Sequence, residues 1–158
     1  MIGSIEATVG IYGASFVIAI LSGFIPLINA EIYLVAVAVT TESIPLAVVL
    51  GFIVAFGQMI AKVGIYKAAR RASNLRPLEE NGKMARARKL MAKWEGKPHL
   101  LTFISATFGI PPFFIVSIVG GMLELPFIQF MTVGFVGRSI RFITVAVVAV
   151  YVKFYSHA

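Results

Sequence analysis

The feature that most constrains the fold of this chain is an apolar run at residues 44–66, in which Lys62 is the only charged residue. A helix rises about 1.5 Å per residue, so a helix of this length crosses the roughly 30 Å hydrocarbon core of a bilayer. Hydrophobic residues make up 59% of the chain and charged residues only 13%, a balance far from that of soluble domains. We therefore predict an all-α integral membrane protein. Further apolar runs lie at residues 9–28, 32–39, 100–123 and 127–152.

Basic residues are concentrated in one segment of the chain. Residues 67–97 contain ten of the fourteen basic residues and three of the seven acidic ones, a local charge of +7 that equals the charge of the whole chain. Loops with an excess of lysine and arginine are typical of the cytoplasmic side of a membrane. We therefore expect a cytoplasmic loop at residues 67–98, which the helix at residues 44–66 enters from the outside.

Part of this loop has the pattern of a basic amphipathic helix. The stretch KMARARKLMAKWE, residues 83–95, places its apolar side chains on one helical face and most of its basic side chains away from it. Such a helix suits the surface of an anionic leaflet. The alternative is a solvated loop helix that only sets the topology. The candidate residues for contact with the membrane surface are Lys83, Arg86, Lys89, Lys93 and Trp94.

Proline interrupts the first apolar run. Pro26 breaks the helix, and Asn29 is a suitable N-cap for a new helix that begins near residue 30. The stretch at residues 30–40 spans only about 17 Å as a helix, which is too short to cross a bilayer. We therefore predict a re-entrant hairpin, which enters and leaves the membrane on the same side.

The second half of the chain repeats this order. An apolar run breaks at Pro111 and Pro112, a short apolar run follows, and a long helix with internal glycines ends the pattern. We predict two inverted repeats in a single membrane domain, each a re-entrant helical hairpin followed by a transmembrane helix. The alternative is four to six ordinary spans that the prolines only kink. The predicted segments are the first repeat at residues 9–66, the loop at residues 67–98 and the second repeat at residues 99–155.

Three charged residues lie where the sequence predicts an apolar environment. Glu31 is in the first turn of the helix after Pro26, where the partial positive charge of a helix N-terminus favours a carboxylate. Arg138 lies about 18 Å along the last helix, near mid-depth, and Arg141 is one turn further on the same face. An ionised side chain near the bilayer centre costs on the order of 3 kcal/mol. We therefore expect Glu31 to pair with Arg138 or Arg141.

The residue types argue against several classes of function. The chain has no cysteine and no aspartate, and its two histidines, His99 and His157, lie at the expected membrane edges. Nucleophilic and metal-dependent catalysis lack their usual residues, so we predict no enzyme, no metal and no cofactor. We expect no nucleic acid either, because the basic loop lies between membrane segments and shows no aromatic-rich groove.

Two motifs resemble a known family. The stretches SFVIAILSGFIPLINAEIYLVA and GRSIRFITVAVVAV are similar to motifs of the DedA, or VTT-domain (SNARE-associated), membrane proteins, and in particular of their small YqaA-like branch. The similarity extends over residues 11–150. The stretch TFGIPPFF departs from the family pattern, which has arginine, or in the small branch aspartate, around the second proline break.

The resemblance implies two facing re-entrant hairpins in the inner or plasma membrane of a prokaryote. It also implies a link to the translocation of lipid carriers or phospholipids and to membrane homeostasis. By position, Glu31 matches the acid of the family's first hairpin, and Arg138 and Arg141 match its late basic pair.

The residues themselves favour the binding of an anion. Guanidinium groups bind phosphate bidentately, so we expect a transporter-like protein that moves a lipid headgroup, a phosphorylated lipid or a small anion. Arg138 and Arg141 are the expected ligands, and Glu31 is the expected competitor or proton carrier. The expected partners are membrane lipids, such as an anionic phospholipid or polyprenyl phosphate. The sequence leaves open whether the protein forms a homo-oligomer. The residues at the two hairpin tips are Pro26, Asn29, Pro111 and Pro112.

The same residues are also compatible with a second function. The protein is then a membrane organiser or interaction protein that transports nothing, and the pair of glutamate and arginine only joins the two halves of the chain.

Overall fold

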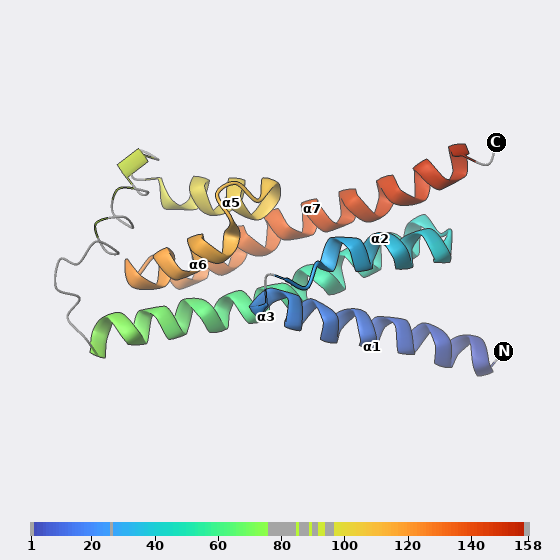
Figure 1. The fold of residues 1–158 in the computed structure, drawn as a ribbon, viewed down its shortest axis with the longest axis horizontal. Coiled ribbons are helices and arrows are strands. Elements are labelled where there is room, and N and C mark those ends of the chain that lie inside the picture. Colours follow the sequence, from blue (N-terminus) through green and yellow to red (C-terminus); the bar gives the residue numbers. More distant parts are fainter. Residues whose placement is uncertain are drawn as a thin grey trace. The chain divides into compact units, whose positions relative to one another are not determined.

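The computed structural model describes residues 2–25, 27–75, 85, 89, 92–93 and 97–156. This part of the chain contains six helices, which confirms the predicted all-α class (Figure 1). The helices are α1 (Ile2–Phe24), α2 (Ala30–Thr41), α3 (Ile44–Leu75), α5 (Pro98–Phe108), α6 (Phe113–Met122) and α7 (Phe127–Ser156).

Two of these helices, α3 and α7, are long and apolar enough to cross a membrane within the described part of the chain. Their candidate spanning segments, Ile44–Ser73 and Phe127–Ser156, have mean hydropathies of 2.3 and 1.8. The helix α3 continues to Leu75, beyond the apolar run that predicted it. Its extension reads YKAARRAS from Tyr66, and alanine and arginine favour a helix without being apolar.

The start of α2 lies where the sequence predicted it. The helix α2 begins at Ala30, and its N-cap is Asn29, as the sequence predicted. The helix closes at Glu42, which adopts a left-handed conformation with a φ of 51° and donates its backbone N–H to the carbonyl of Ala38. Pro26 lies outside the described residues.

The second break lies where the two prolines predicted it. The helix α5 ends at Gly109, whose φ of 77° suits a residue without a side chain, and the peptide bond between Ile110 and Pro111 is cis. The helix α6 begins directly after Pro112. Glu124 follows α6 with a φ of 51°, the same left-handed value as Glu42.

The described residues form two compact units, and the division passes through both long helices. The first unit contains the residues up to Ala61 and those from Arg138 onward. It therefore combines α1 and α2 with the first part of α3 and the second part of α7. Within this unit Gly51 brings α3 close to α7, because a Cβ at Gly51 would lie 2.8 Å from Cγ1 and 2.9 Å from Cα of Ile143.

The second unit, Lys62–Gly137, has an aromatic core. Tyr66 of α3 is 1% exposed, and its ring centroid lies 5.0 Å from that of Phe130 and 5.6 Å from that of Phe127, both in α7. Phe113, the first residue of α6, stacks on Phe130 with centroids 5.7 Å apart. The Tyr66 hydroxyl donates to the carbonyl of Leu125 at 2.5 Å. These contacts join α3, α6 and α7 around one buried tyrosine.

Candidate functional site

The first turn of α2 fixes the position of Glu31. The side-chain oxygen of Asn29 accepts hydrogen bonds from the backbone N–H groups of Glu31 at 2.9 Å and Ile32 at 3.3 Å. These bonds satisfy two of the amide groups that a helix leaves without partners at its N-terminus. The carboxylate of Glu31 therefore lies in the first turn, where the helix dipole stabilises a negative charge.

Glu31 and Arg141 form an ion pair within the first unit. Nε of Arg141 donates to Oε1 of Glu31 at 2.5 Å, which joins α7 to α2. The side chains are 25% exposed for Arg141 and 34% exposed for Glu31. The pair is therefore partly shielded and still reachable from outside the protein. The sequence predicted that Glu31 pairs with one of the two arginines, and the structure gives Arg141 as this partner.

Arg138 contacts a different set of residues. Its terminal nitrogen donates to the amide oxygen of Gln58 at 2.6 Å, and its guanidinium carbon lies 5.7 Å from the ring centroid of Phe142. The amide nitrogen of Gln58 in turn donates to the hydroxyl of Ser22 at 2.9 Å, and that hydroxyl donates to the carbonyl of Ala19 at 2.9 Å. A chain of hydrogen bonds therefore runs from α7 through α3 to α1.

We call the residues Ser22, Glu31, Gln58, Arg138 and Arg141 the polar cluster. They come from all four helical segments of the first unit and contain two cationic side chains and one carboxylate. Ser139 lies between the two arginines in the sequence, is 6% exposed, and has no hydrogen-bond partner for its hydroxyl among the described residues. The cluster is a set of polar and charged groups with a formal charge of +1, on helices that are otherwise mostly apolar.

Gln58 is the member of the cluster whose contact with an arginine the sequence did not reveal. Gln58 is a polar residue inside the apolar run at residues 44–66, and its amide nitrogen forms an interhelical hydrogen bond to Ser22. The available signal was position along the helix: Gln58 is the fifteenth of the 32 residues of α3, and Arg138 is the twelfth of the 30 residues of α7. Both residues therefore lie near the middle of the two helices that are long and apolar enough to cross a membrane.

A second ion pair holds the other end of α2. Nζ of Lys153 lies 2.5 Å from Oε1 of Glu42 and donates to the carbonyl of Val39 at 3.0 Å. Glu31 and Glu42 thus contact Arg141 and Lys153 in the same order along α7, so α2 and the second part of α7 run parallel. The sequence analysis did not identify this pair of Lys153 and Glu42.

The second unit has its own charged contacts. Arg70 of α3 pairs with Glu124 at 3.2 Å, and both side chains are 46% exposed. Nζ of Lys62 lies 5.1 Å from the ring centroid of Phe114, the second residue of α6, and Lys62 is 4% exposed. Such an arrangement stabilises a buried cation by its attraction to the face of the ring.

The predicted tip residues that the structure describes are Asn29 at the first break and Pro111 and Pro112 at the second. Pro111 is partly exposed, and its carbonyl accepts a hydrogen bond from the hydroxyl of Ser105 at 2.5 Å. Pro112 and, at the first break, Asn29 are exposed. Both prolines belong to the second unit, whereas Asn29 and the polar cluster belong to the first.

The predicted surface helix of the loop is described only in part. Lys89 and Lys93 are helical and exposed, as a helix at a membrane surface or in solvent requires. Lys83, Arg86 and Trp94 lie outside the described residues.

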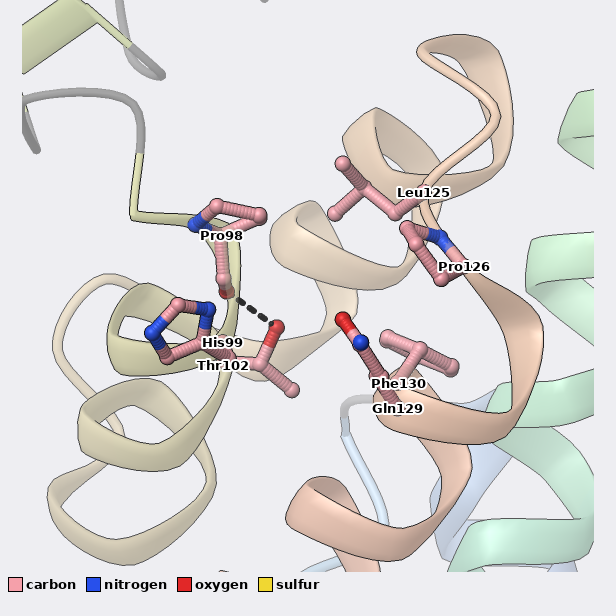
Figure 2. A pocket seen from close by; sticks show the side chains of 7 residues that line it. All are labelled: Pro98, His99, Thr102, Leu125, Pro126, Gln129 and Phe130. Carbon is pink, nitrogen blue, oxygen red and sulfur yellow. Dashed lines mark hydrogen bonds between the residues drawn. The ribbon is translucent and has the colours of Figure 1, made fainter.

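A small cavity in the second unit lies beside the start of α7 (Figure 2). Its volume is about 10 Å³, which is about the space for one water molecule. The hydroxyl of Thr102 is already engaged there, because it donates to the carbonyl of Pro98 at 2.7 Å. This cavity therefore offers no room for a substrate. Its lining residues are Pro98, His99, Thr102, Leu125, Pro126, Gln129 and Phe130.

No group of three or more histidine, aspartate or glutamate side chains suited to a metal ion occurs in the part of the chain that the structure describes. The polar cluster, with its two guanidinium groups, is instead suited to an anion with several oxygens.

Comparison with known proteins adds no relative. No protein-family model matches the chain, no curated protein is significantly similar to it, and no solved structure resembles it significantly.

Proposed function

We propose that this chain is an integral membrane protein of the DedA type that moves a lipid headgroup, a phosphorylated lipid or a small anion. Its place is the inner or plasma membrane of a prokaryote, with the basic loop on the cytoplasmic side. The two helices long enough to cross a bilayer and the charge of the loop support this placement. Its partners are membrane lipids.

An inverted repeat of re-entrant hairpin and spanning helix is part of the proposal. Each compact unit combines one helix pair, the first part of the long helix that follows it and the second part of the other long helix. Arg70, which pairs with Glu124, and Lys153, which pairs with Glu42, are each the twenty-seventh residue of their helix. The matching positions and the matching φ of Glu42 and Glu124 support a common ancestral half.

The short helices of the two halves also make related contacts through their second residues. Glu31, the second residue of α2, contacts a cation of α7, and Phe114, the second residue of α6, contacts a cation of α3. An ion pair in one half thus corresponds to a contact between a cation and an aromatic ring in the other. This substitution accounts for the lack of charge in the stretch TFGIPPFF.

The observation that carries the function is the composition of the polar cluster. Two guanidinium groups lie one helical turn apart near the middle of α7, and the carboxylate of Glu31 accepts a hydrogen bond from one of them, that of Arg141. A phosphate that enters the cluster competes with Glu31 for Arg141 and with Gln58 for Arg138. Glu31 then releases its partner or takes up a proton, and the exposed fractions of both members of the pair allow the exchange.

The test is a flipping assay in proteoliposomes with phospholipid and polyprenyl phosphate as separate substrates. Arg138→Ala, Arg141→Ala and the double variant are each expected to slow flipping at least about tenfold, which corresponds to a barrier raised by roughly 1.4 kcal/mol. Arg70→Ala is the matched control, because it removes an ion-paired arginine of the other long helix. Folded single and double variants that flip both lipids at the wild-type rate contradict the proposal.

A second candidate function rests on the same geometry. Arg141 is bound to Glu31 and Arg138 to Gln58, so both arginines already join helices of the first unit. A membrane organiser or interaction protein that transports nothing needs only this structural role.

A further inference from the structure

An apolar groove lies between α2 and the second part of α7, within the first unit. Its volume is about 600 Å³, which lies in the range of sites for small ligands. Figure 1 shows α2 beside the last turns of α7, and the two ion pairs bracket this stretch. Its lining residues are Val35, Val39, Val145, Val148, Ala149, Val152, Lys153 and Ser156.

The two ends of the groove differ in chemistry. Valine and alanine line most of it, whereas Lys153 and Ser156 lie at the end near the C-terminus of α7. The Lys153 ammonium has three donors, and the contacts of the described residues take two of them, to Glu42 and to the carbonyl of Val39. The third donor is available for an oxygen of a ligand.

The direction and length of the groove match one leaflet of a bilayer. From Val145 to Ser156 the helix rises about 16 Å, close to half of a hydrocarbon core of roughly 30 Å. Tyr151 and Tyr155 are 50% and 80% exposed near the same end of α7, and exposed tyrosines at a helix end are typical of the boundary between membrane and water. The polar end of the groove therefore lies at headgroup level and the apolar end points to the bilayer centre.

We propose that this groove binds one acyl chain of a membrane glycerophospholipid, whose phosphate lies against Lys153. The valine side chains shield the acyl chain from water, and the remaining donor of Lys153 binds a phosphate oxygen of the lipid. The lipid keeps its ordinary orientation in the leaflet. The site differs from the polar cluster, since it adjoins the cluster only at its inner end, where Arg141 pairs with Glu31.

This inference shares with the proposed function only the placement of α7 in a membrane. A lipid in the groove binds whether or not the protein moves anything, so binding is measured at equilibrium and without transport. The method is native mass spectrometry of the full chain released from detergent, with phosphatidylglycerol and diacylglycerol of identical chains as probes. The two lipids differ in the phosphate headgroup, so their ratio of dissociation constants reports its recognition.

The first variants address the phosphate. The wild-type protein is expected to bind phosphatidylglycerol about tenfold more tightly than diacylglycerol. Lys153→Gln removes the positive charge and is expected to reduce this preference to within about twofold. Lys153→Arg keeps the positive charge and is expected to keep the preference. Glu42→Gln breaks the same ion pair but leaves the ammonium, so the preference is expected to persist or rise. An equal loss in Lys153→Gln and Glu42→Gln, or none in Lys153→Gln, overturns phosphate recognition.

The second variants address the acyl chain and do not depend on the ion pair. Val148 is 52% exposed, so Val148→Trp fills the groove without replacing a core residue. It is expected to weaken binding of both lipids about tenfold. Val17→Trp is the matched control, because Val17 is 54% exposed on α1 and does not line the groove. Equal binding by wild type, Val148→Trp and Val17→Trp overturns the proposed site, whatever the result of the flipping assay.

Discussion

Glu31 and Arg141 lie 110 residues apart in the sequence, and their side chains meet at 2.5 Å between α2 and α7. The contact brings together the first and last thirds of the chain inside one compact unit. A carboxylate and a guanidinium placed singly in hydrocarbon each carry a cost on the order of 3 kcal/mol, which the pair reduces. The ion pair is therefore a long-range contact that stabilises the first unit.

Loss of either charge is expected to destabilise the protein. Glu31→Gln or Arg141→Gln leaves the other charge without its partner, and we expect each to lower the free energy of unfolding by about 2 kcal/mol. The value is below that of a fully buried pair because both side chains keep part of their exposure. Reversible unfolding in mixed micelles measures these values. The double variant of Glu31→Gln and Arg141→Gln is expected to lose about 1 kcal/mol less stability than the sum of the two single losses, which is the coupling energy of the pair.

The pair of Arg70 and Glu124 is the control for this cycle. Both of its side chains are 46% exposed, so Arg70→Gln is expected to change the free energy of unfolding by less than about 1 kcal/mol. Losses of equal size at Arg70 and Arg141 would contradict a special role of the partly buried pair.

Replacement of Gln58 is expected to destabilise the protein more than replacement of its partner Ser22. Gln58→Leu removes the acceptor for Arg138 and the donor for Ser22, and both groups lie in a largely buried environment. A lost hydrogen bond to a charged group costs about 1.5–3 kcal/mol, and one between neutral groups about 1 kcal/mol. Gln58→Leu should therefore lower the free energy of unfolding by at least about 1 kcal/mol more than Ser22→Ala. The same unfolding assay tests this order, and a larger loss for Ser22→Ala would contradict it.

The local signals in the sequence predicted the breaks and caps of the helices. Asn29 caps α2, and Pro112 directly precedes α6, as expected from their residue types. These features depend on a few neighbouring residues. The end of α3 was predicted too early, because the apolar pattern ends at residue 66 while the helix continues through alanine and arginine.

The long-range partners followed from the sequence only in part. Arg138 and Arg141 lie one turn apart on one face of α7, so depth alone did not decide which of them meets Glu31. The contact of Lys153 with Glu42 depends on how far α2 is shifted along α7, which no local pattern determines. Position along the apolar runs narrowed the possible partners of Glu31 to two arginines, and the packing of α2 against α7 selected Arg141.

Gly51 is expected to tolerate no side chain. A Cβ there would lie 2.8–2.9 Å from the side chain and backbone of Ile143, so Gly51→Ala forces α3 and α7 apart. We expect a loss of about 1–3 kcal/mol in the free energy of unfolding. Gly13→Ala is the matched control, since a Cβ at Gly13 meets nothing within 4 Å and alanine favours a helix. Equal stability of the two variants would show that the helices do not pack closely at Gly51.

The hydroxyl of Tyr66 is expected to stabilise the second unit. Tyr66→Phe keeps the ring between Phe127 and Phe130 but removes the hydrogen bond to the carbonyl of Leu125. We expect a loss of about 1 kcal/mol in the free energy of unfolding. Tyr151→Phe, which removes a hydroxyl from a tyrosine that is 50% exposed, is expected to change stability by a few tenths of a kcal/mol. An unchanged stability in Tyr66→Phe contradicts this role.

Exchange of the two charges separates the two candidate functions. The double variant Glu31→Arg with Arg141→Glu keeps one cation and one carboxylate at the positions of the ion pair. It places the cation at the N-terminus of α2, where the helix dipole is less favourable, so we expect it to recover most but not all of the stability lost in the single variants. Unfolding in mixed micelles measures this recovery.

The same exchange variant is then compared with wild type in the flipping assay and for growth of cells that depend on the protein. If the arginines bind the transported anion, the variant folds but flips at least about tenfold more slowly, because Arg138 and Arg141 no longer act together on one helix. If the pair only joins helices, stability and cellular activity recover together. A variant that folds, and flips lipid as fast as wild type, contradicts the role of Arg141 as a ligand of the transported anion.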